Sequence, residues 1–288
     1  MSLAPPASPL VTPSWLAAHL GERELVVVDV RWYLKGKKGS DAYAEGHLPN
    51  AVFADLDRDL SSLPGPGRPG RHPLPDADAF ADFLARIGVV EGTVVVAYDD
   101  GGGATAARLW WLLRYFGHDG GRVLEGGIQA WVDAGHPLQT STIQRPRAER
   151  LHLVPRPEMV VDKARVREIL SGPSGVVLDA RASERYQGVV EPIDARPGHV
   201  PGAKSAPFSG NLAAPAGRFL SPDELRARYS SLGALEARPL VAYCGSGVTA
   251  CHDLLALSLI GRPDALLYEG SWGDWAADLA LPAALGEK

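Results

Sequence analysis

The chain is almost free of cysteine: among its 288 residues only Cys244 and Cys251 occur. Their spacing fits neither a disulfide framework nor a zinc site, and no second pair exists to complete one. If either thiol carries chemistry, it is easiest to keep reduced in a reducing compartment. We therefore expect a cytoplasmic protein without structural disulfides or a metal centre.

Long apolar runs are also missing, since no segment approaches the roughly 18 uninterrupted apolar residues of a membrane span. The first 13 residues are rich in Pro, Ala and Ser and lack the basic start and apolar stretch of a signal peptide. The net charge of −5 argues weakly against nucleic acid as a partner. No Gly-x-Gly-x-x-Gly or Walker pattern occurs, and we expect no cofactor.

What the chain does contain is a repeat of about half its length. Four motifs recur in the same order, at offsets between 144 and 152 residues. Val26–Asp29 matches Val176–Asp179, and Gly46–Ala51 matches Gly198–Ala203. Val96–Asp99 matches Val241–Cys244. Leu124–Gly127, followed by Trp131, matches Tyr268–Ser271, followed by Trp275. This order predicts a duplicated domain.

Each half alternates buried, β-branched runs with helical spacing, which predicts an α/β fold with a mostly parallel sheet flanked by helices. The length of the chain and its 45% hydrophobic content suit two such domains. We predict domains over residues 1–140 and 158–288, joined by a Pro-rich linker over 141–157.

The reactive centre is predicted within residues 241–250, a buried strand followed by Cys244, a glycine-rich turn and a helix. Two glycines allow several N–H groups to point at one centre, and the helix dipole adds positive potential. A thiol in this cradle should have a lowered pKa and act as a nucleophile. A lone cysteine is more often a small core residue, but the glycines favour a catalytic Cys244.

The first half carries Asp99 at the position of Cys244. An aspartate cannot act as a sulfur nucleophile, so we expect the first domain to keep the scaffold without this chemistry. Its expected use is to wall the site and to contribute side chains to it, because ligand sites often lie between domains.

The two Gly-His-x-Pro-x-Ala turns, the two Asp-bearing strands and the Cys loop make the chain similar to the rhodanese superfamily in its tandem form. The resemblance covers most of the chain and implies a sulfurtransferase in which a Cys244 persulfide passes sulfur to cyanide or a thiol. The loop Cys244–Thr249 resembles that of 3-mercaptopyruvate sulfurtransferases, whereas thiosulfate-preferring members carry Arg and Lys after the cysteine. Mercaptopyruvate is thus the expected donor and thiosulfate the alternative.

The resemblance also implies a proton relay of Ser246, His72 and Asp57, in which the imidazole takes up a proton. A loop histidine before proline is otherwise often a solvent-exposed linker residue, so that interpretation of His72 stays open. Further expected partners are a small-molecule donor, a thiol or cyanide acceptor and a thioredoxin-like reductant.

A donor with an anionic end needs a fixed cation. The resemblance implies that Arg185, before Tyr186, contacts the donor; the alternative is a surface ion pair with Glu184 or Glu191. Mercaptopyruvate-specific members carry a second arginine in a Glu-Pro-Arg run, which here reads Glu-Pro-Ile, so Arg196 is its displaced candidate. The remaining predicted contacts come from the loop itself: Gly245, Gly247, Val248 and Thr249.

Residues that recur in both halves are predicted to be structural, because only one half carries the cysteine. They are His47 and His199, Arg31 and Arg181, and Trp131 and Trp275. Cys251 is predicted to be an apolar filler, with a resolving role in oxidation as the alternative.

Three rival interpretations of the Cys244 loop exist. A cysteine phosphatase needs an arginine six residues after its cysteine, where this chain has Ala250, and no arginine occurs before Arg262. A non-catalytic binding module is disfavoured by the intact loop around Cys244. A sulfur carrier for a partner protein shares the persulfide step and stays open.

Overall fold

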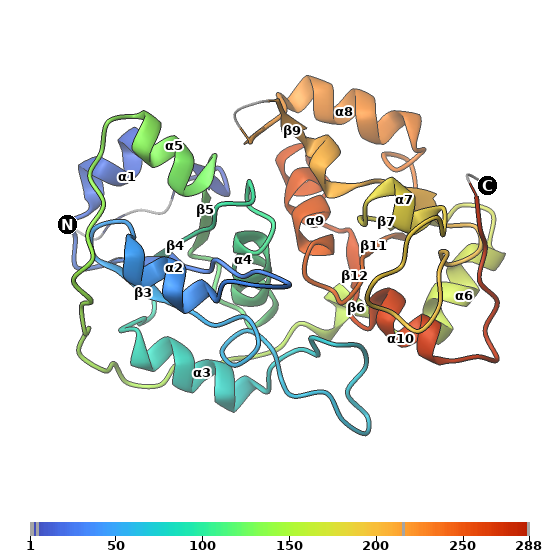
Figure 1. The fold of residues 1–288 in the computed structure, drawn as a ribbon, viewed down its shortest axis with the longest axis horizontal. Coiled ribbons are helices and arrows are strands. Elements are labelled where there is room, and N and C mark those ends of the chain that lie inside the picture. Colours follow the sequence, from blue (N-terminus) through green and yellow to red (C-terminus); the bar gives the residue numbers. More distant parts are fainter. Residues whose placement is uncertain (1–2, 4–5, 215–216, 287–288) are drawn as a thin grey trace. The chain divides into compact units, whose positions relative to one another are not determined.

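The computed structural model describes residues 3, 6–214 and 217–286 (Figure 1). The chain divides into two compact units. Unit 1 comprises residues 1–61, 75–156 and 214–219, and unit 2 comprises residues 62–74, 157–213 and 220–288. Unit 2 thus includes a short segment, residues 62–74, from the first half of the sequence, and this segment carries His72.

Unit 1 is built on a five-stranded sheet in the order β1-β5-β4-β2-β3. All four neighbouring pairs are parallel. The strands are β1 (Leu10–Val11), β2 (Leu25–Asp29), β3 (Ala51–Phe53), β4 (Val94–Tyr98) and β5 (Gly121–Leu124). The helices are α1 (Pro13–His19), α2 (Gly39–Glu45), α3 (Ala77–Arg86), α4 (Ala106–Tyr115) and α5 (Gly127–Asp133).

Unit 2 repeats this arrangement with a parallel sheet in the order β6-β12-β11-β7-β8. Its strands are β6 (Val160–Val161), β7 (Val176–Asp179), β8 (Lys204–Ser205), β11 (Leu240–Tyr243) and β12 (Leu266–Tyr268). Its helices are α6 (Lys163–Ser171), α7 (Ser183–Tyr186), α8 (Pro222–Ser231), α9 (Ala250–Leu259) and α10 (Ser271–Ala277), with 3₁₀ turns η1 (Pro157–Met159) and η2 (Phe208–Asn211). Two short strands complete the elements: β9 (Leu212–Ala213), which belongs to unit 2, and β10 (Arg218–Phe219), which belongs to unit 1. The shared strand order confirms the predicted duplication and α/β class.

The central strands form because their residues are mostly β-branched, as in β2 and β4, or otherwise apolar, as in β11, and can be buried on both faces. Every residue of β2 and β4 is buried, as is every residue of β11. Local signals also set the helix ends: Thr12 accepts a hydrogen bond from the Trp15 amide, and Pro13 occupies the first position of α1.

A buried Asp–Arg pair stands at the end of β2 and, equivalently, at the end of β7. Arg31 donates to Asp29 and, at 2.7 Å, to the Gly46 carbonyl. Arg181 donates to Asp179 and, at 2.7 Å, to the Gly198 carbonyl. In each unit the pair ties the end of the strand to the glycine of the Gly-His-x-Pro turn. Because both units carry it, the pair is part of the scaffold.

The repeated histidines are equally buried. His47 stacks on Tyr43 and lies 2.8 Å from its carbonyl through Nδ1. His199 makes the same two contacts with Tyr186. These contacts agree with the predicted structural role, since they hold the Gly-His-x-Pro turn against the preceding helix.

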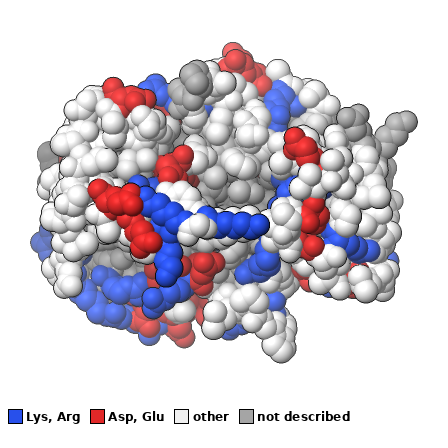
Figure 2. Space-filling view, in the orientation of Figure 1, with Lys and Arg blue, Asp and Glu red and all other residues white. Residues whose placement is uncertain are grey.

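Acidic and basic side chains lie side by side over much of the face drawn in Figure 2. Among the ion pairs of the structure are Arg147 with Asp82 and Arg156 with Asp119. Among the described residues, no helix combines the length and the apolar character that a bilayer crossing requires.

Candidate active site

Cys244 directly follows the central strand β11 and begins the loop that leads into α9. Its side chain is buried, and its Sγ accepts hydrogen bonds from the amides of Gly247 at 3.1 Å and Ser246 at 3.5 Å. Gly247 has a φ of 80°, and a Cβ there would lie 2.6 Å from the Glu269 carbonyl oxygen. Only glycine therefore allows the turn that aims these amides at the sulfur. The loop can hold negative charge on that sulfur.

The backbone of Cys244 is fixed by the start of α10. Its amide donates to Ser271 Oγ at 3.1 Å, and its carbonyl accepts from the Trp272 amide at 2.9 Å. Ser271 adopts a φ of 54°, and its hydroxyl donates to the Tyr268 carbonyl at 2.9 Å. The sequence interpretation did not single out Ser271. The available signal was the repeat, which pairs it with Gly127, another residue with positive φ.

His72 lies in unit 2 together with the loop, because segment 62–74 packs with that unit. His72 Nδ1 is 2.7 Å from Ser246 Oγ, and both side chains are buried. The interpretation of His72 as a solvent-exposed linker residue is therefore wrong. The structure joins an imidazole to the hydroxyl two residues after the cysteine, which is an arrangement that can move a proton.

Arg185, on α7, lies against the Cys loop. A Cβ added to Gly245 would be 3.4 Å from Arg185 Nη1. Its Nη2 donates to Glu191 at 2.7 Å and to Asp194 at 2.8 Å. The ion pair with Glu191 and the proximity to the loop thus coexist, and the two interpretations of Arg185 do not exclude each other.

Arg71 is a second guanidinium at the loop, and the sequence interpretation assigned it no role. Its Nη1 donates to Asp194, and its Nη2 would lie 2.8 Å from a Cβ at Gly245. Burial lowers the pKa of the Arg71 guanidinium, and the charge of the nearby Cys244 opposes that effect. The side chain remains charged at neutral pH because the ordinary pKa of arginine is so high. The only sequence signal was its place directly before His72.

Arg196 occupies a different place. Its Nη2 donates to the carbonyls of Trp275, Asp278 and Leu281, at 3.3, 3.1 and 2.7 Å. These carbonyls lie at and beyond the C-terminal end of α10, where a cation complements the helix dipole. This arrangement favours a structural role for Arg196 over the predicted contact with a donor.

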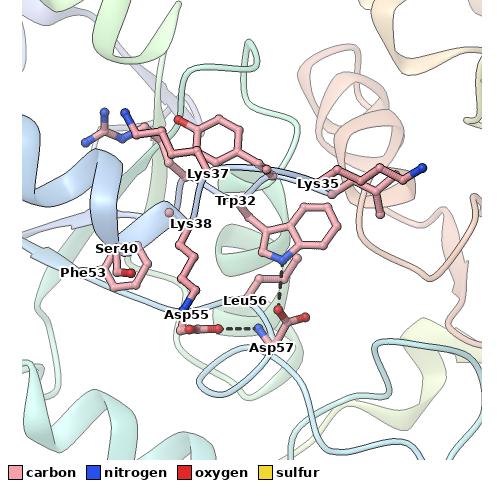
Figure 3. Close-up of a pocket in the computed structure, with 14 residues that line it drawn as sticks. Trp32, Lys35, Lys37, Lys38, Ser40, Phe53, Asp55, Leu56 and Asp57 are labelled. Carbon is pink, nitrogen blue, oxygen red and sulfur yellow. Dashed lines mark hydrogen bonds between the residues drawn. The ribbon is translucent and has the colours of Figure 1, made fainter.

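Asp57 belongs to unit 1, where its carboxylate accepts a hydrogen bond from Trp32 Nε1 at 3.0 Å. Its amide donates to Asp55 at 2.9 Å. Figure 3 shows these residues in the lining of a cavity of about 380 Å³, beside Lys38. Within unit 1, the Asp57 carboxylate is thus oriented by Trp32 and lines the cavity.

The remaining predicted residues complete the loop. Val248 is buried and Thr249 is the N-cap of α9. Cys251, in the first turn of α9, is buried, and its thiol donates to the Gly247 carbonyl at 3.3 Å. Cys251 therefore stabilises the turn at Gly247, whose amide donates to the Cys244 sulfur.

The equivalent loop of unit 1 contains Asp99, which is also buried. Its Oδ1 accepts from the amides of Gly101 and Gly103, at 2.9 and 2.8 Å. Its Oδ2 accepts from the amides of Thr105 and Ala106, both at 2.8 Å, and from the Thr105 hydroxyl at 3.0 Å. The loop amides therefore converge on an anion in unit 1.

Two α/β units, each with a parallel sheet of the same strand order and with Cys244 on the loop after the central strand of the second, define a tandem rhodanese-like protein. The family model described as the rhodanese-like domain matches twice, over residues 12–134 and 162–278. The chain belongs to this family.

Relatives extend over nearly the whole chain. A probable 3-mercaptopyruvate sulfurtransferase of Pseudomonas aeruginosa is 47% identical over 283 residues, covering 96% of this chain and 98% of the relative. A Mycobacterium tuberculosis protein named as a thiosulfate sulfurtransferase is 38% identical, covering 96% and 97%. The solved 3-mercaptopyruvate sulfurtransferase of Leishmania major superposes with a TM-score of 0.82 at 34% identity, covering 97% of this chain and 78% of that one.

Proposed function

We propose that the protein is a sulfurtransferase that moves a sulfur atom from 3-mercaptopyruvate to a thiophilic acceptor through a persulfide on Cys244. The observation that carries this proposal is the convergence of two loop amides on the buried Cys244 sulfur. It is supported by relatives whose names include both mercaptopyruvate and thiosulfate enzymes.

In the first step, the Cys244 thiolate attacks the sulfur of mercaptopyruvate. An S–S bond forms, the carbon–sulfur bond breaks, and its electron pair leaves on the enolate of pyruvate. The proton of the donor thiol ends on carbon 3 of pyruvate, so no external oxidant or reductant is required. The amides of Ser246 and Gly247 stabilise the negative charge on the sulfur before and after transfer.

Ser246 and His72 provide the path for that proton. The hydrogen bond of 2.7 Å between them supports this role, since a positioned acid–base group contributes about 10² to 10⁴ in rate. Asp57, the third predicted member, stays a prediction: Asp57→Asn should lower turnover with mercaptopyruvate if its carboxylate assists His72.

In the second step, cyanide or a thiolate attacks the outer sulfur of the persulfide. The S–S bond breaks and the Cys244 thiolate is restored. A thioredoxin-like protein could supply the thiol, and a reducing cytoplasm would keep Cys244 free between cycles. Both free cysteines are buried, which suits this requirement.

Initial rates with mercaptopyruvate and thiosulfate, each with cyanide, test the proposal. We expect faster transfer from mercaptopyruvate, and no transfer in Cys244→Ser. The matched control is Cys251→Ser, which keeps a donor toward the Gly247 carbonyl and should retain activity within a few-fold. Residual transfer in Cys244→Ser would refute the assignment of the nucleophile, and faster transfer from thiosulfate would reverse that of the donor.

A further inference from the structure

The strongest unassigned feature of unit 2 is Arg71. It is supplied by residues 62–74, a segment that lies far from the Cys loop in sequence but belongs to the same compact unit. The segment is closely packed there, because a Cβ at Gly70, whose φ is 74°, would lie 2.6 Å from the Gly270 carbonyl oxygen. Arg71 thus lies on a tightly packed backbone segment next to the Cys244 loop.

The guanidinium of Arg71 lies over two glycines that are hydrogen bonded to each other. The Gly273 amide donates to the Gly245 carbonyl at 3.0 Å. Added Cβ atoms would lie 2.8 Å from Arg71 Nη2 at Gly245 and 3.2 Å from Arg71 Nη1 at Gly273. A side chain at either glycine would displace the guanidinium, so the small residues make room for a cation one residue past Cys244.

Arg71 and Arg185 are joined by one carboxylate. Asp194 Oδ1 accepts from Arg71 Nη1, and Asp194 Oδ2 accepts from Arg185 Nη2 at 2.8 Å. The nitrogens nearest Gly245 are Arg71 Nη2 and Arg185 Nη1, and neither donates to another described residue of the protein. Asp194 therefore orients two guanidinium groups while leaving one nitrogen of each for a ligand.

The turn that contains Asp194 lacks an arginine of its own, so the second guanidinium at this turn comes from another segment. Glu191 Oε1 accepts from the amides of Ile193 at 3.1 Å and Asp194 at 3.0 Å. Ile193 is the residue that stands where the Glu-Pro-Arg run has its arginine. A guanidinium on segment 62–74 instead reaches the adjacent Asp194, with about a third of its side chain still exposed.

We propose that Arg71 is a donor-binding residue that, together with Arg185, holds the carboxylate of the sulfur donor beside Cys244. This inference rests on the proposed function for the identity of the donor. Two guanidinium groups suit a carboxylate because each N–H donates a charge-assisted hydrogen bond. Such an anchor holds the donor before and during the reaction, so its loss should act mainly on KM.

The test compares Arg71→Ala with native enzyme. We expect KM for mercaptopyruvate to rise about 10- to 100-fold with a much smaller change in kcat, in line with the loss of a hydrogen bond between charged groups. Arg68→Ala, an exposed arginine of the same segment, is the matched control and should leave KM unchanged. The double variant Arg71→Ala/Ile193→Arg should recover part of the loss, because it returns a guanidinium to the same turn.

A direct binding measurement separates this inference from the proposed function. Pyruvate carries the same carboxylate but no transferable sulfur, and it can be titrated into Cys244→Ser with and without Arg71→Ala. We expect Arg71→Ala to weaken pyruvate binding about 10-fold or more. Unchanged pyruvate affinity and unchanged KM, with the variant folded by circular dichroism, would overturn the role of Arg71. Pyruvate binding that depends on Arg71 in an enzyme inactive with mercaptopyruvate would instead overturn only the proposed donor.

Discussion

The two loops after the central strands use the same cradle for different anions. In unit 1 the cradle is filled by the carboxylate of Asp99, which accepts from four backbone amides and one hydroxyl. In unit 2 two amides converge on the sulfur of Cys244. The acceptor in the first loop is a carboxylate, whereas in the second it is the sulfur that we propose as the nucleophile. The cradle is therefore a property of the fold, and the residue within it decides whether chemistry occurs.

Replacing Cys244 by aspartate, the residue at the equivalent position of the first loop, should have the largest effect on activity. In Cys244→Asp, the carboxylate can accept the loop amides as Asp99 does, so we expect the fold to be retained. Sulfur transfer should fall by roughly 10⁴-fold or more, because the nucleophile is gone. Steady-state rates together with thermal unfolding measure both effects. A variant that unfolds would show that the two cradles are not equivalent.

The helix after each loop buries an ionisable side chain, Arg108 in α4 and Asp253 in α9. Burial raises the pKa of Asp253 to about 7, and its hydrogen bond from Asn211 opposes this shift only in part. The folded state thus keeps a proton that the unfolded chain loses near pH 4. Stability should therefore fall as the pH rises from about 4 to about 7, by a few kcal/mol from this group.

Denaturant titrations of native protein and Asp253→Asn over this pH range measure that dependence. The difference in free energy of unfolding between the two should grow between about pH 4 and about pH 7 and then level off. A difference that is constant with pH would contradict the buried, protonated state of Asp253.

Removing the anion from the first cradle should destabilise unit 1. Asp99→Ala leaves four amides, three of them buried, without their acceptor, and we expect a loss of about 3 kcal/mol. Cys244→Ala removes only weak acceptance by sulfur and should cost about 1 kcal/mol. Chemical denaturation of both variants checks the contrast. Equal losses would show that Asp99 does not organise its loop.

The second loop has Ser246 where the first has Gly101, and this difference predicts a dependence on the donor. Mercaptopyruvate needs a proton on carbon as its carbon–sulfur bond breaks, whereas thiosulfate releases sulfite and needs none. We expect Ser246→Ala and His72→Gln to lower kcat/KM about 10²-fold with mercaptopyruvate and only a few-fold with thiosulfate. Equal losses with both donors would assign Ser246 and His72 to the loop structure instead of proton transfer.

The smallest expected effect concerns Ser271, which stands where unit 1 has Gly127. Ser271→Ala keeps the positive φ but loses both hydroxyl hydrogen bonds, and should cost about 1 to 2 kcal/mol. Ser271→Gly loses the same bonds but relieves the backbone, and should cost about 1 kcal/mol or less. Thermal unfolding ranks the two. The reverse order would mean that the left-handed conformation carries no strain.

The sequence was sufficient to predict the duplication, the parallel sheets and the Cys loop, because each depends on local patterns. Val94–Tyr98, for example, is a β-branched run in the sequence and is β4 in the structure. Likewise, Phe80, Phe83 and Leu84 recur at helical spacing in the sequence and lie on α3, and Gly88 just beyond it has a φ of 80°. Such segments carry their own periodicity and stop signals.

Contacts made by irregular segments could not be predicted in this way. Residues 61–75 have the Pro and Gly content of a loop, and nothing in that composition says that 62–74 pack with the other half of the chain. The sequence predicts a donor contact for Arg196 and assigns none to Arg71. Only the fold shows that Arg71 faces Gly245 and that Arg196 caps carbonyls beyond α10.

The central claim, a persulfide on Cys244, is tested most directly by mass spectrometry of Cys251→Ser. No Lys or Arg separates the two cysteines, so a tryptic peptide of native protein contains both, whereas this variant leaves Cys244 as the only thiol. After treatment with mercaptopyruvate, we predict that the Cys244 peptide gains one sulfur atom and that cyanide removes it as thiocyanate. An unmodified Cys244 in a variant that still turns over would contradict the account.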